Sequence, residues 1–212
     1  MRYTPPLQTA RFVSREKRFF AHLELPDGSP LTAHLANTGS MRGCAEVGAP
    51  VRIWDSQNPA RKLRFSVEQI CVGGRWILVN TARPNTIVEE ALRAGVVPEL
   101  TGYPVIQRER RPDGTRRRLD FLLQGPAGRA WVEVKNVTLL EDGVLRFPDA
   151  VTERGRHHLE VLVDRVRAGE RAVLFFHAGH EGGLRVEVAR EVDPAYGVAL
   201  DRTMDAEIKI VY

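Results

Sequence analysis

The chain has 212 residues, 43% of them hydrophobic and 27% charged, which is long enough for one large globular domain or two small ones. Its two cysteines are too few for a disulfide framework, and no run approaches the ~20 apolar residues that cross a bilayer, so secreted scaffolds and membrane proteins are excluded. The formal net charge of +4 favours a polyanionic partner. We therefore expect a cytoplasmic protein whose leading candidate partner is nucleic acid.

The N-terminal part consists of short strand-like runs separated by turn sequences. The turns include Pro26-Asp27-Gly28 and Gly73-Gly74. The runs cover residues 7–13, 18–25, 31–35, 51–54, 62–72 and 76–79. Antiparallel strands of this length close most economically into a small barrel, and the OB-fold is a common form of it. We predict an OB-like β-barrel domain over residues 1–82.

The composition changes near residue 82, where the first helix is predicted. Thr86 and Glu89 have the spacing of a capping box, and Gly95 is a typical helix stop. The elements predicted after it are strands at 103–109, 118–123 and 130–135, a helix at 150–168, a strand at 172–177, a helix at 195–204 and a strand at 207–212. This order predicts a mixed sheet flanked by helices over residues 83–212. The fold class is therefore α/β, with two domains.

The chemistry-bearing residues lie on two of these strands. Residues 118–123 and 130–135 alternate with period 2 and predict a hairpin across residues 124–129. Its polar face would bring Asp120, Glu133 and Lys135 together. Two carboxylates can hold Mg²⁺ or Mn²⁺, and a lysine beside a bound water suits phosphodiester cleavage.

The acid-x-Lys triplet is not specific alone, because Glu207-Ile208-Lys209 repeats it without a preceding aspartate strand. The chain uses arginine at nearly every basic position, and Lys135 is one of few lysines. A compact ammonium with a shiftable pKa is not replaceable by a guanidinium at a metal-water site, so a lysine here favours catalysis. The alternative is an ordinary salt-bridged strand face.

An aspartate on one strand and Glu-x-Lys on the next, inside this order of elements, resembles the PD-(D/E)XK nuclease superfamily. Over residues 5–212 the chain resembles the sugar fermentation stimulation protein A family. The motifs that carry this resemblance are Pro5-Pro6-Leu7, Lys17-Arg18-Phe19, Asn37-Thr38-Gly39, Val79-Asn80-Thr81, Arg118-Leu119-Asp120-Phe121, Glu133-Val134-Lys135 and Phe-Pro-Asp-Ala-Val-Thr-Glu-Arg-Gly at 147–155. The resemblance implies an OB-like domain joined to a nuclease-type domain, DNA binding, and a part in sugar utilisation. Arg117 and Arg156-His157 depart from the family pattern.

The resemblance also implies a role for each site residue. Asp120 and Glu133 would be metal ligands, with the Val134 carbonyl as a third, and Lys135 would orient or deprotonate the attacking water. Secondary candidates are Glu109 at the end of a strand, Glu90 on the first helix, and Arg154 and His158, which lie on one side of the second long helix and could face a scissile phosphate.

Basic residues beside aromatic ones suggest where nucleic acid binds. In the barrel they are Lys17, Arg18, Arg61 and Lys62. In the second domain Arg116, Arg117 and Arg118 precede Asp120 and would contact the phosphate backbone. A solvated basic surface is the alternative in both places.

Two hypotheses follow for the function. The first is a metal-dependent nuclease that binds DNA. The second is a non-catalytic DNA-binding regulator of sugar-utilisation genes, in which the same carboxylates support binding or stability.

Overall fold

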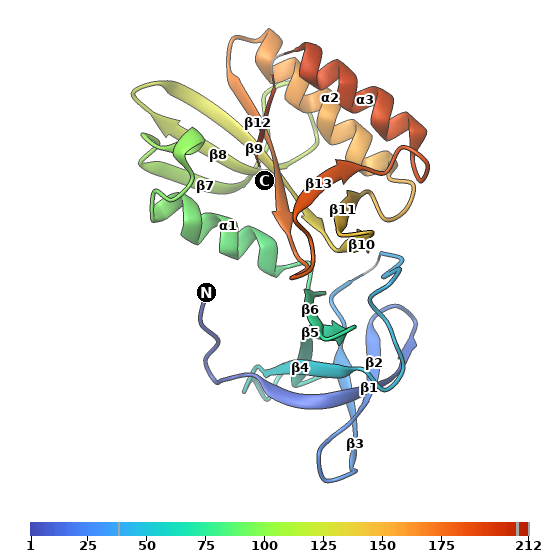
Figure 1. Ribbon diagram of the computed structural model, residues 1–212. Helices are drawn as coiled ribbons and strands as arrows, with labels where there is room; N and C mark the ends of the chain where they lie inside the picture. The colour runs from blue at the N-terminus through green and yellow to red at the C-terminus, as the bar shows by residue number, and fades with distance from the viewer. Residues whose placement is uncertain (38, 207, 212) are drawn as a thin grey trace. The chain divides into compact units, whose positions relative to one another are not determined.

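The protein divides into two compact units in the computed structural model, which describes residues 1–37, 39–206 and 208–211 (Figure 1). Unit 1 comprises Met1–Arg83, Val137–Asp149 and Ala178–Glu187, and unit 2 comprises Pro84–Asn136, Ala150–His177 and Val188–Tyr212. Thr38 of the Asn37-Thr38-Gly39 motif lies outside the described residues. Glu207 and Tyr212, the two ends of the predicted final strand, also lie outside them.

Unit 1 is built around a β-barrel. Its strands are β1 (Gln8–Glu16), β2 (Phe20–Glu24), β3 (Pro30–His34), β4 (Pro50–Asp55), β5 (Phe65–Val72) and β6 (Arg75–Leu78). They follow the order β3-β2-β1-β4-β5-β6, and a parallel pairing of β3 with β5 at His34 and Ser66 closes the barrel. The predicted barrel is confirmed, and each predicted run corresponds to one strand.

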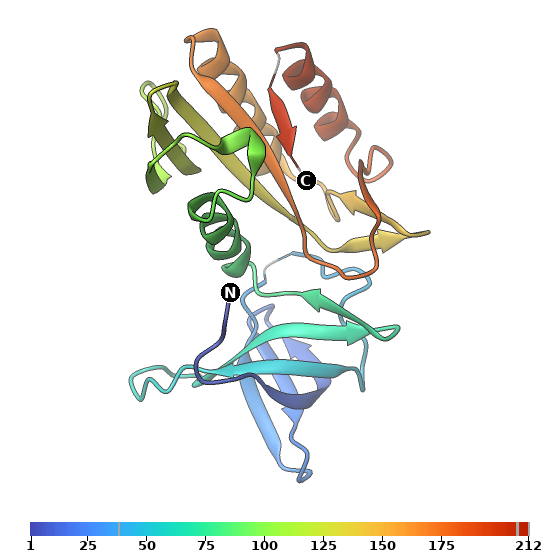
Figure 2. The same ribbon diagram turned by 60° about the vertical axis from the view of Figure 1, so that its left-hand side comes forward.

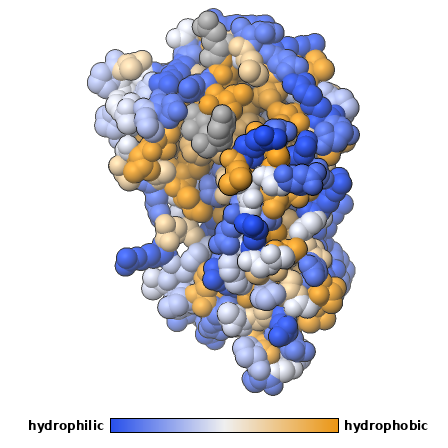
Figure 3. Space-filling view, viewed as in Figure 1, coloured by the Kyte–Doolittle hydropathy of each residue, from blue (hydrophilic) through white to orange (hydrophobic). Residues whose placement is uncertain are grey.

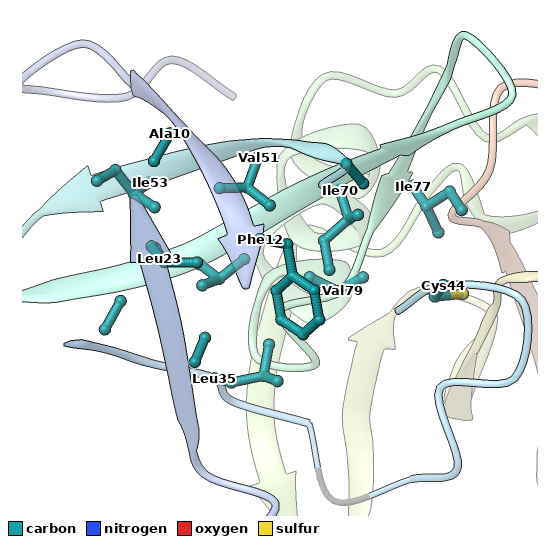
Figure 4. Packing of buried hydrophobic residues seen from close by; sticks show 14 of the residues in the cluster. Ala10, Phe12, Leu23, Leu35, Cys44, Val51, Ile53, Ile70, Ile77 and Val79 are labelled. Atoms are coloured by element: carbon teal, nitrogen blue, oxygen red, sulfur yellow. The ribbon is translucent and has the colours of Figure 1, made fainter. Parts of the chain in front are cut away.

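The barrel core is formed by inward-pointing side chains, which alternate along the strands with side chains that point outward. On β1, Ala10 and Phe12 are buried while their neighbours in the strand are exposed. Figure 4 shows the side chains of Phe12, Leu23, Leu35 and Ile70 directed toward one another inside the barrel. Burying such side chains contributes ~1.5–3 kcal/mol each, so this face holds the barrel together.

Two segments from the C-terminal half complete unit 1. They contribute β10 (Leu139–Glu141), β11 (Val144–Phe147) and β13 (Arg185–Val188), in the order β10-β11-β13. The Leu78 N–H donates to the Gly179 carbonyl at 2.7 Å beside β6. A Cβ at Gly183 would lie 2.2 Å from Leu145 Cγ, so the close approach there requires glycine. The sequence patterns predict none of these three strands.

Unit 2 holds a mixed sheet in the order β14-β12-β9-β8-β7. Its strands are β7 (Val105–Arg110), β8 (Leu119–Gly125), β9 (Gly128–Val137), β12 (Arg171–Ala178) and β14 (Lys209–Val211). β7, β8 and β9 pair antiparallel, whereas β12 and β14 pair parallel. The short helix η1 (Pro98–Leu100) precedes β7. The predicted mixed sheet is confirmed.

Helices cover both faces of this sheet, as Figures 1 and 2 show. They are α1 (Arg83–Arg93), α2 (Glu153–Arg167) and α3 (Pro194–Asp205). Val88 of α1 packs against Phe121 and Val132 on one face, and α2 contacts the residues that point to the other face.

The predicted start of the first helix at Thr86 is wrong, and with it the capping box. The helix begins at Arg83, which places Thr86 inside it. Pro84 suits the first turn because its φ is already helical and its missing N–H needs no partner there. The Asn80 carbonyl accepts from the Arg83 N–H at 3.1 Å, and Asn80 Oδ1 accepts from the Ala82 N–H at 3.0 Å.

On the face of the molecule shown in Figure 3, hydrophilic residues surround smaller patches of hydrophobic ones. Among the described residues, none of the helices has the length and apolar character needed to cross a membrane.

Candidate functional site

The hairpin of β8 and β9 brings the predicted site residues together. Its ladder runs from Gly125 opposite Gly128 to Phe121 opposite Val132, which confirms the predicted hairpin. Asp120 and Glu133 are the next residues on the two strands. There the side chain of Asp120 meets β9, because its Oδ2 accepts from the Val134 N–H at 2.7 Å. Asp120 therefore lies where the two strands separate.

Asp120 is held from the helix side as well. Nδ2 of Asn85, in the first turn of α1, donates to Asp120 Oδ1 at 2.7 Å. Burial and the nearby charge of Glu133 raise the pKa of Asp120 to about 6, although the bonds from Val134 and Asn85 act in the opposite direction. The two carboxylates are thus close enough to interact electrostatically.

Glu133 is buried, with 3% of its surface exposed, and several groups crowd one of its oxygens. Lys135 Nζ donates to Glu133 Oε1 at 2.6 Å, and His158 Nδ1 of α2 also bonds to Oε1. Lys135 Nζ is 3.1 Å from His158 Nδ1. Burial opposes ionisation of Glu133, yet Lys135 and His158 hold its pKa below the ordinary value. Glu133 is therefore an anion in this site.

The second oxygen of Glu133 is different. Within the part of the chain that the structure describes, Oε2 is buried and has no hydrogen-bond partner. A buried polar atom without a partner costs ~1–3 kcal/mol, and more for a charged group, so such an atom indicates a missing partner. Because Oε1 is crowded and Oε2 is unpartnered, Oε2 is the oxygen of Glu133 that could bind a cation.

The ligands available to such a cation are few. Among the described residues, no group of three or more His, Cys, Asp or Glu side chains is placed to bind a metal. Mg²⁺ commonly binds through one or two carboxylates and keeps several waters, so two carboxylates are compatible with it. The carboxylates of Asp120 and Glu133 fit a hard divalent cation, and water or carbonyl oxygens would have to supply its remaining ligands.

A buried aspartate at the start of α3 holds the start of α2, the helix that carries His158. Asp193, the N-cap of α3, accepts from the Tyr196 N–H at 2.9 Å, from the Thr152 N–H at 2.8 Å and from Arg156 Nη1 at 3.0 Å. Burial opposes its ionisation, but these donors lower the pKa of Asp193. The N-terminal ends of α2 and α3 are therefore tied together at the start of the helix that carries His158.

Tight packing between α2 and Tyr196 of α3 explains the glycine at the end of the 147–155 motif. A Cβ at Gly155 would lie 2.8 Å from Thr152 Cγ2 and 3.2 Å from Tyr196 Cε2. Burial, and then the charges of Glu133 and Asp193, raise the pKa of Tyr196, so its phenol is neutral. Only glycine lets α2 approach the neutral ring of Tyr196 this closely.

Of the secondary candidates, His158 lies in this cluster, whereas Glu109, Glu90 and Arg154 are exposed at the surface. Glu109 is exposed and has a φ of 53°, and within the described residues no hydrogen bond or ion pair joins it to the cluster. Glu90 and Arg154 are exposed on their helices. Val134 contacts Asp120 through its N–H, and a metal-binding role for its carbonyl stays a prediction.

Arg116, Arg117 and Arg118 are all exposed in the loop between β7 and β8. Arg117 lines a groove of about 330 Å³ together with Asp113, His157 and Glu160. The loop thus presents positive charge in unit 2, beside the start of the strand that carries Asp120.

In unit 1 the predicted basic residues lie in two loops, Lys17 and Arg18 between β1 and β2 and Arg61 and Lys62 between β4 and β5, and we name these four residues the barrel-end cluster. His34 pairs with Phe20 on one side and with Ser66 on the other. Arg61 Nη2 donates to Ser66 Oγ at 3.1 Å, and burial together with the charge of Arg61 lowers the pKa of His34. Lys17, Arg18 and Lys62 are exposed, and Phe19 is 47% exposed beside them. The β1–β2 and β4–β5 loops therefore present basic and aromatic groups at one end of the barrel.

The sequence patterns miss Asn85 and Asp193. The Pro84-Asn85-Thr86 run predicts only a helix start, and nothing in it indicates a contact with a strand 35 residues later. Asp193 before Pro194 does have a recognisable helix-start pattern, since aspartate is a favoured N-cap and proline a favoured first residue.

Comparison with known proteins covers both parts of the chain. The family described as "SfsA N-terminal OB domain" matches residues 13–79, and the family described as "Sugar fermentation stimulation protein RE domain" matches residues 82–212.

Curated relatives carry the same description over almost the full length. A "Sugar fermentation stimulation protein homolog" of Geobacter sulfurreducens is 45% identical over 204 residues, which is 96% of this chain and 87% of that protein. One of Acidithiobacillus ferrooxidans is 46% identical over 210 residues, covering 98% of this chain and 90% of that protein.

A solved structure has the same fold. It is titled "The structure of Pyrococcus Furiosus SfsA in complex with Ca2+", and it matches with a TM-score of 0.90 at 24% identity. The match covers 99% of this chain and 88% of that chain. The predicted OB-like barrel and the mixed α/β second domain are confirmed.

Proposed function

Because the chain belongs to the sugar fermentation stimulation protein family, we propose that it binds DNA and hydrolyses phosphodiester bonds at a divalent-metal site of nuclease type. The observation that carries this proposal is the buried Oε2 of Glu133, which has no partner among the described residues although the oxygen beside it is crowded by Lys135 and His158. The free thiols of Cys44 and Cys71 fit a reducing cytoplasm.

Asp120 and Glu133 are the residues that would hold Mg²⁺ or Mn²⁺, with the Val134 carbonyl as a further ligand. The relative from Pyrococcus furiosus is described in complex with Ca²⁺, another cation that prefers oxygen ligands, which supports a cation site in this family. A bound divalent cation would supply charge to a phosphodiester oxygen and acidity to a water molecule.

Lys135 and His158 supply the remaining chemistry. Lys135 has 11% of its side chain exposed, and its Nζ lies 2.6 Å from a proposed metal ligand. Its amine could take up a proton, and its ammonium could stabilise negative charge beside the reacting phosphate. His158 holds Glu133 in place and limits the freedom of Lys135. Glu109 and Arg154 remain further candidates for contact with the substrate.

Two basic surfaces would bind the nucleic acid. Arginines 116, 117 and 118 are exposed next to the strand of Asp120 and would neutralise backbone phosphates. The barrel-end cluster lies on the loops with which OB-folds commonly bind oligonucleotides, and Phe19 offers a ring for base stacking. Neither surface predicts a sequence preference.

The test is a cleavage assay with purified protein on labelled single-stranded DNA, duplex DNA and RNA, each with Mn²⁺ or with EDTA. We expect Mn²⁺-dependent cleavage that Glu133→Gln and Lys135→Ala abolish. Lys209→Ala, which changes the lysine of the second Glu-x-Lys copy, is the matched control and should cleave as the parent does. Metal-dependent binding without cleavage of any substrate would refute the enzymatic part.

One observation favours the second candidate, a non-catalytic DNA-binding regulator of sugar-utilisation genes. Lys135 is ion-paired with Glu133 in a buried pair, and such pairs commonly serve the structure. Under that alternative neither the parent nor Lys135→Ala cleaves any substrate. Mn²⁺ stabilises the protein or its complex with DNA, and Lys135→Ala changes only the stability.

A further inference from the structure

Asn85 has no role in the sequence analysis, yet it contacts one of the proposed metal ligands. It lies in the first turn of α1, directly after Pro84, and its Nδ2 donates to Asp120 Oδ1 at 2.7 Å. We propose that Asn85 is a positioning residue of the metal site: it fixes the carboxylate of Asp120, which would hold a divalent cation together with Glu133. The inference rests on the proposed metal site and adds a residue to it.

The chemistry of the contact fixes the orientation of both groups. An ionised carboxylate only accepts hydrogen bonds, so the end of the Asn85 amide that faces Asp120 must be the NH₂ end. The Val134 N–H donates to the other oxygen of Asp120 at 2.7 Å. With one donor on each oxygen, the carboxylate plane is set by α1 and β9 together, and each oxygen keeps a lone pair for a metal.

This arrangement makes the site ready before a metal arrives. An aspartate side chain that is free to rotate loses rotamer freedom on binding a metal, and a carboxylate held by two donors has already lost it. Partners that orient metal ligands in this way are typically worth 10–100-fold in metal affinity, as an order of magnitude. Asn85 should therefore act on affinity without being a ligand.

The charge balance explains why an amide serves at this position. The cluster already holds the carboxylates of Asp120 and Glu133, and like charges in one site repel each other in the absence of metal. A third carboxylate beside Asp120 would add repulsion, whereas an amide adds a donor. Glu89, the nearby acid on α1, pairs instead with Arg93 at 2.6 Å and with Arg108 at 3.3 Å.

The first test measures Mn²⁺ affinity from the electron paramagnetic resonance signal of free aqueous Mn²⁺. Asn85→Ala should bind Mn²⁺ about 10–100-fold more weakly than the parent. Thr86→Ala is the matched control, because Thr86 lies on the same turn and contacts only Arg108, at 3.4 Å, among the hydrogen bonds described. It should bind as the parent does.

Asn85→Asp separates positioning from ligation, because it keeps the shape of the side chain and removes the donor. We expect it to bind Mn²⁺ no more tightly than the parent. Tighter binding would mean that position 85 is a ligand position, and the positioning role would be wrong.

The second test needs no metal. The Val134 amide proton reports on the carboxylate of Asp120, since it donates to Oδ2. In Asn85→Ala this resonance should shift, and in Thr86→Ala it should stay in place, while both variants keep the remaining spectrum. An unmoved Val134 resonance with unchanged Mn²⁺ affinity would overturn the inference. A parent that binds no Mn²⁺ would overturn the proposed metal site itself, and the Val134 resonance tells that failure apart from a failure of the Asn85 contact.

Discussion

Saturating Mn²⁺ should raise the melting temperature of the parent protein and of Lys135→Ala, but hardly that of Asp120→Asn. A ligand at 100 times its dissociation constant stabilises the folded state by about 2.7 kcal/mol. For a chain of 212 residues that unfolds as one unit, each kcal/mol corresponds to about 2–4 °C, so we expect a rise of about 5–10 °C. Asp120→Asn keeps the size of the side chain and removes one ligand charge.

The Lys135→Ala variant separates the metal ligands from the ammonium beside them. Lys135 and Glu133 are a buried pair, with 11% and 4% of their side chains exposed, so removing the lysine leaves a buried charge and should destabilise the metal-free protein by about 3–5 kcal/mol. An exposed pair on a strand face would lose only ~0.2–1 kcal/mol. Because Mn²⁺ supplies positive charge to the same carboxylate, its stabilising effect should be at least as large as in the parent.

The assay is a thermal melt of each protein with Mn²⁺ and with EDTA, followed by circular dichroism. Asp201→Asn is the control, since Asp201 forms an exposed ion pair with Arg190 and should leave the metal effect unchanged. Equal Mn²⁺-induced shifts in the parent and in Asp120→Asn would refute the assignment of Asp120 as a ligand. No shift in any variant would refute the metal site.

Three further outcomes are expected. Replacing the whole barrel-end cluster by alanine should reduce the slope of log affinity against log salt by up to about four times 0.7 on single strands or 0.9 on duplex DNA, measured by fluorescence anisotropy. Asp193→Asn should destabilise the protein by about 3 kcal/mol at pH 7, because charged hydrogen bonds are lost. Folding lowers the pKa of Asp193, so the ionised carboxylate adds to the free energy of unfolding at any pH above the unfolded pKa of about 3.9. This stabilisation is lost as the pH falls through the folded pKa. Urea melts of the parent and the variant should therefore converge in acid. Gly183→Ala should destabilise by about 1–3 kcal/mol in the same melts, since its methyl group would overlap Leu145.

The barrel strands could be predicted because each has one buried and one exposed face. On β4, buried Val51, Ile53 and Asp55 alternate with half-exposed or exposed neighbours, so the period of two is visible in the sequence itself. The hairpin of β8 and β9 was predictable for the same reason, and it is this hairpin that brings Asp120 and Glu133 together.

The strands of the small sheet in unit 1 were not predicted, although one signal for them exists. Asp142 and Gly143 have φ values of 50° and 77° and join β10 to β11, as expected of a two-residue turn with an Asp-Gly sequence. The strands it joins are too short to display a period. Their third partner, β13, lies some forty residues further along the chain, and local patterns carry no information on that pairing.

Predicting the candidate site requires both the periodicity of the strands and the three-dimensional fold. Periodicity places Asp120 and Glu133 on one hairpin, but it does not give the burial that leaves Glu133 Oε2 without a partner among the described residues. That burial comes from α2, whose His158 covers Glu133 because Asp193 ties the start of α2 to α3. The burial of Glu133 on β9 thus depends on an aspartate sixty residues later, which acts by capping α3 and binding the start of α2. The sequence alone contains the signals for the helix cap at Asp193 and for the strand that carries Glu133. Only the fold shows that the first affects the second.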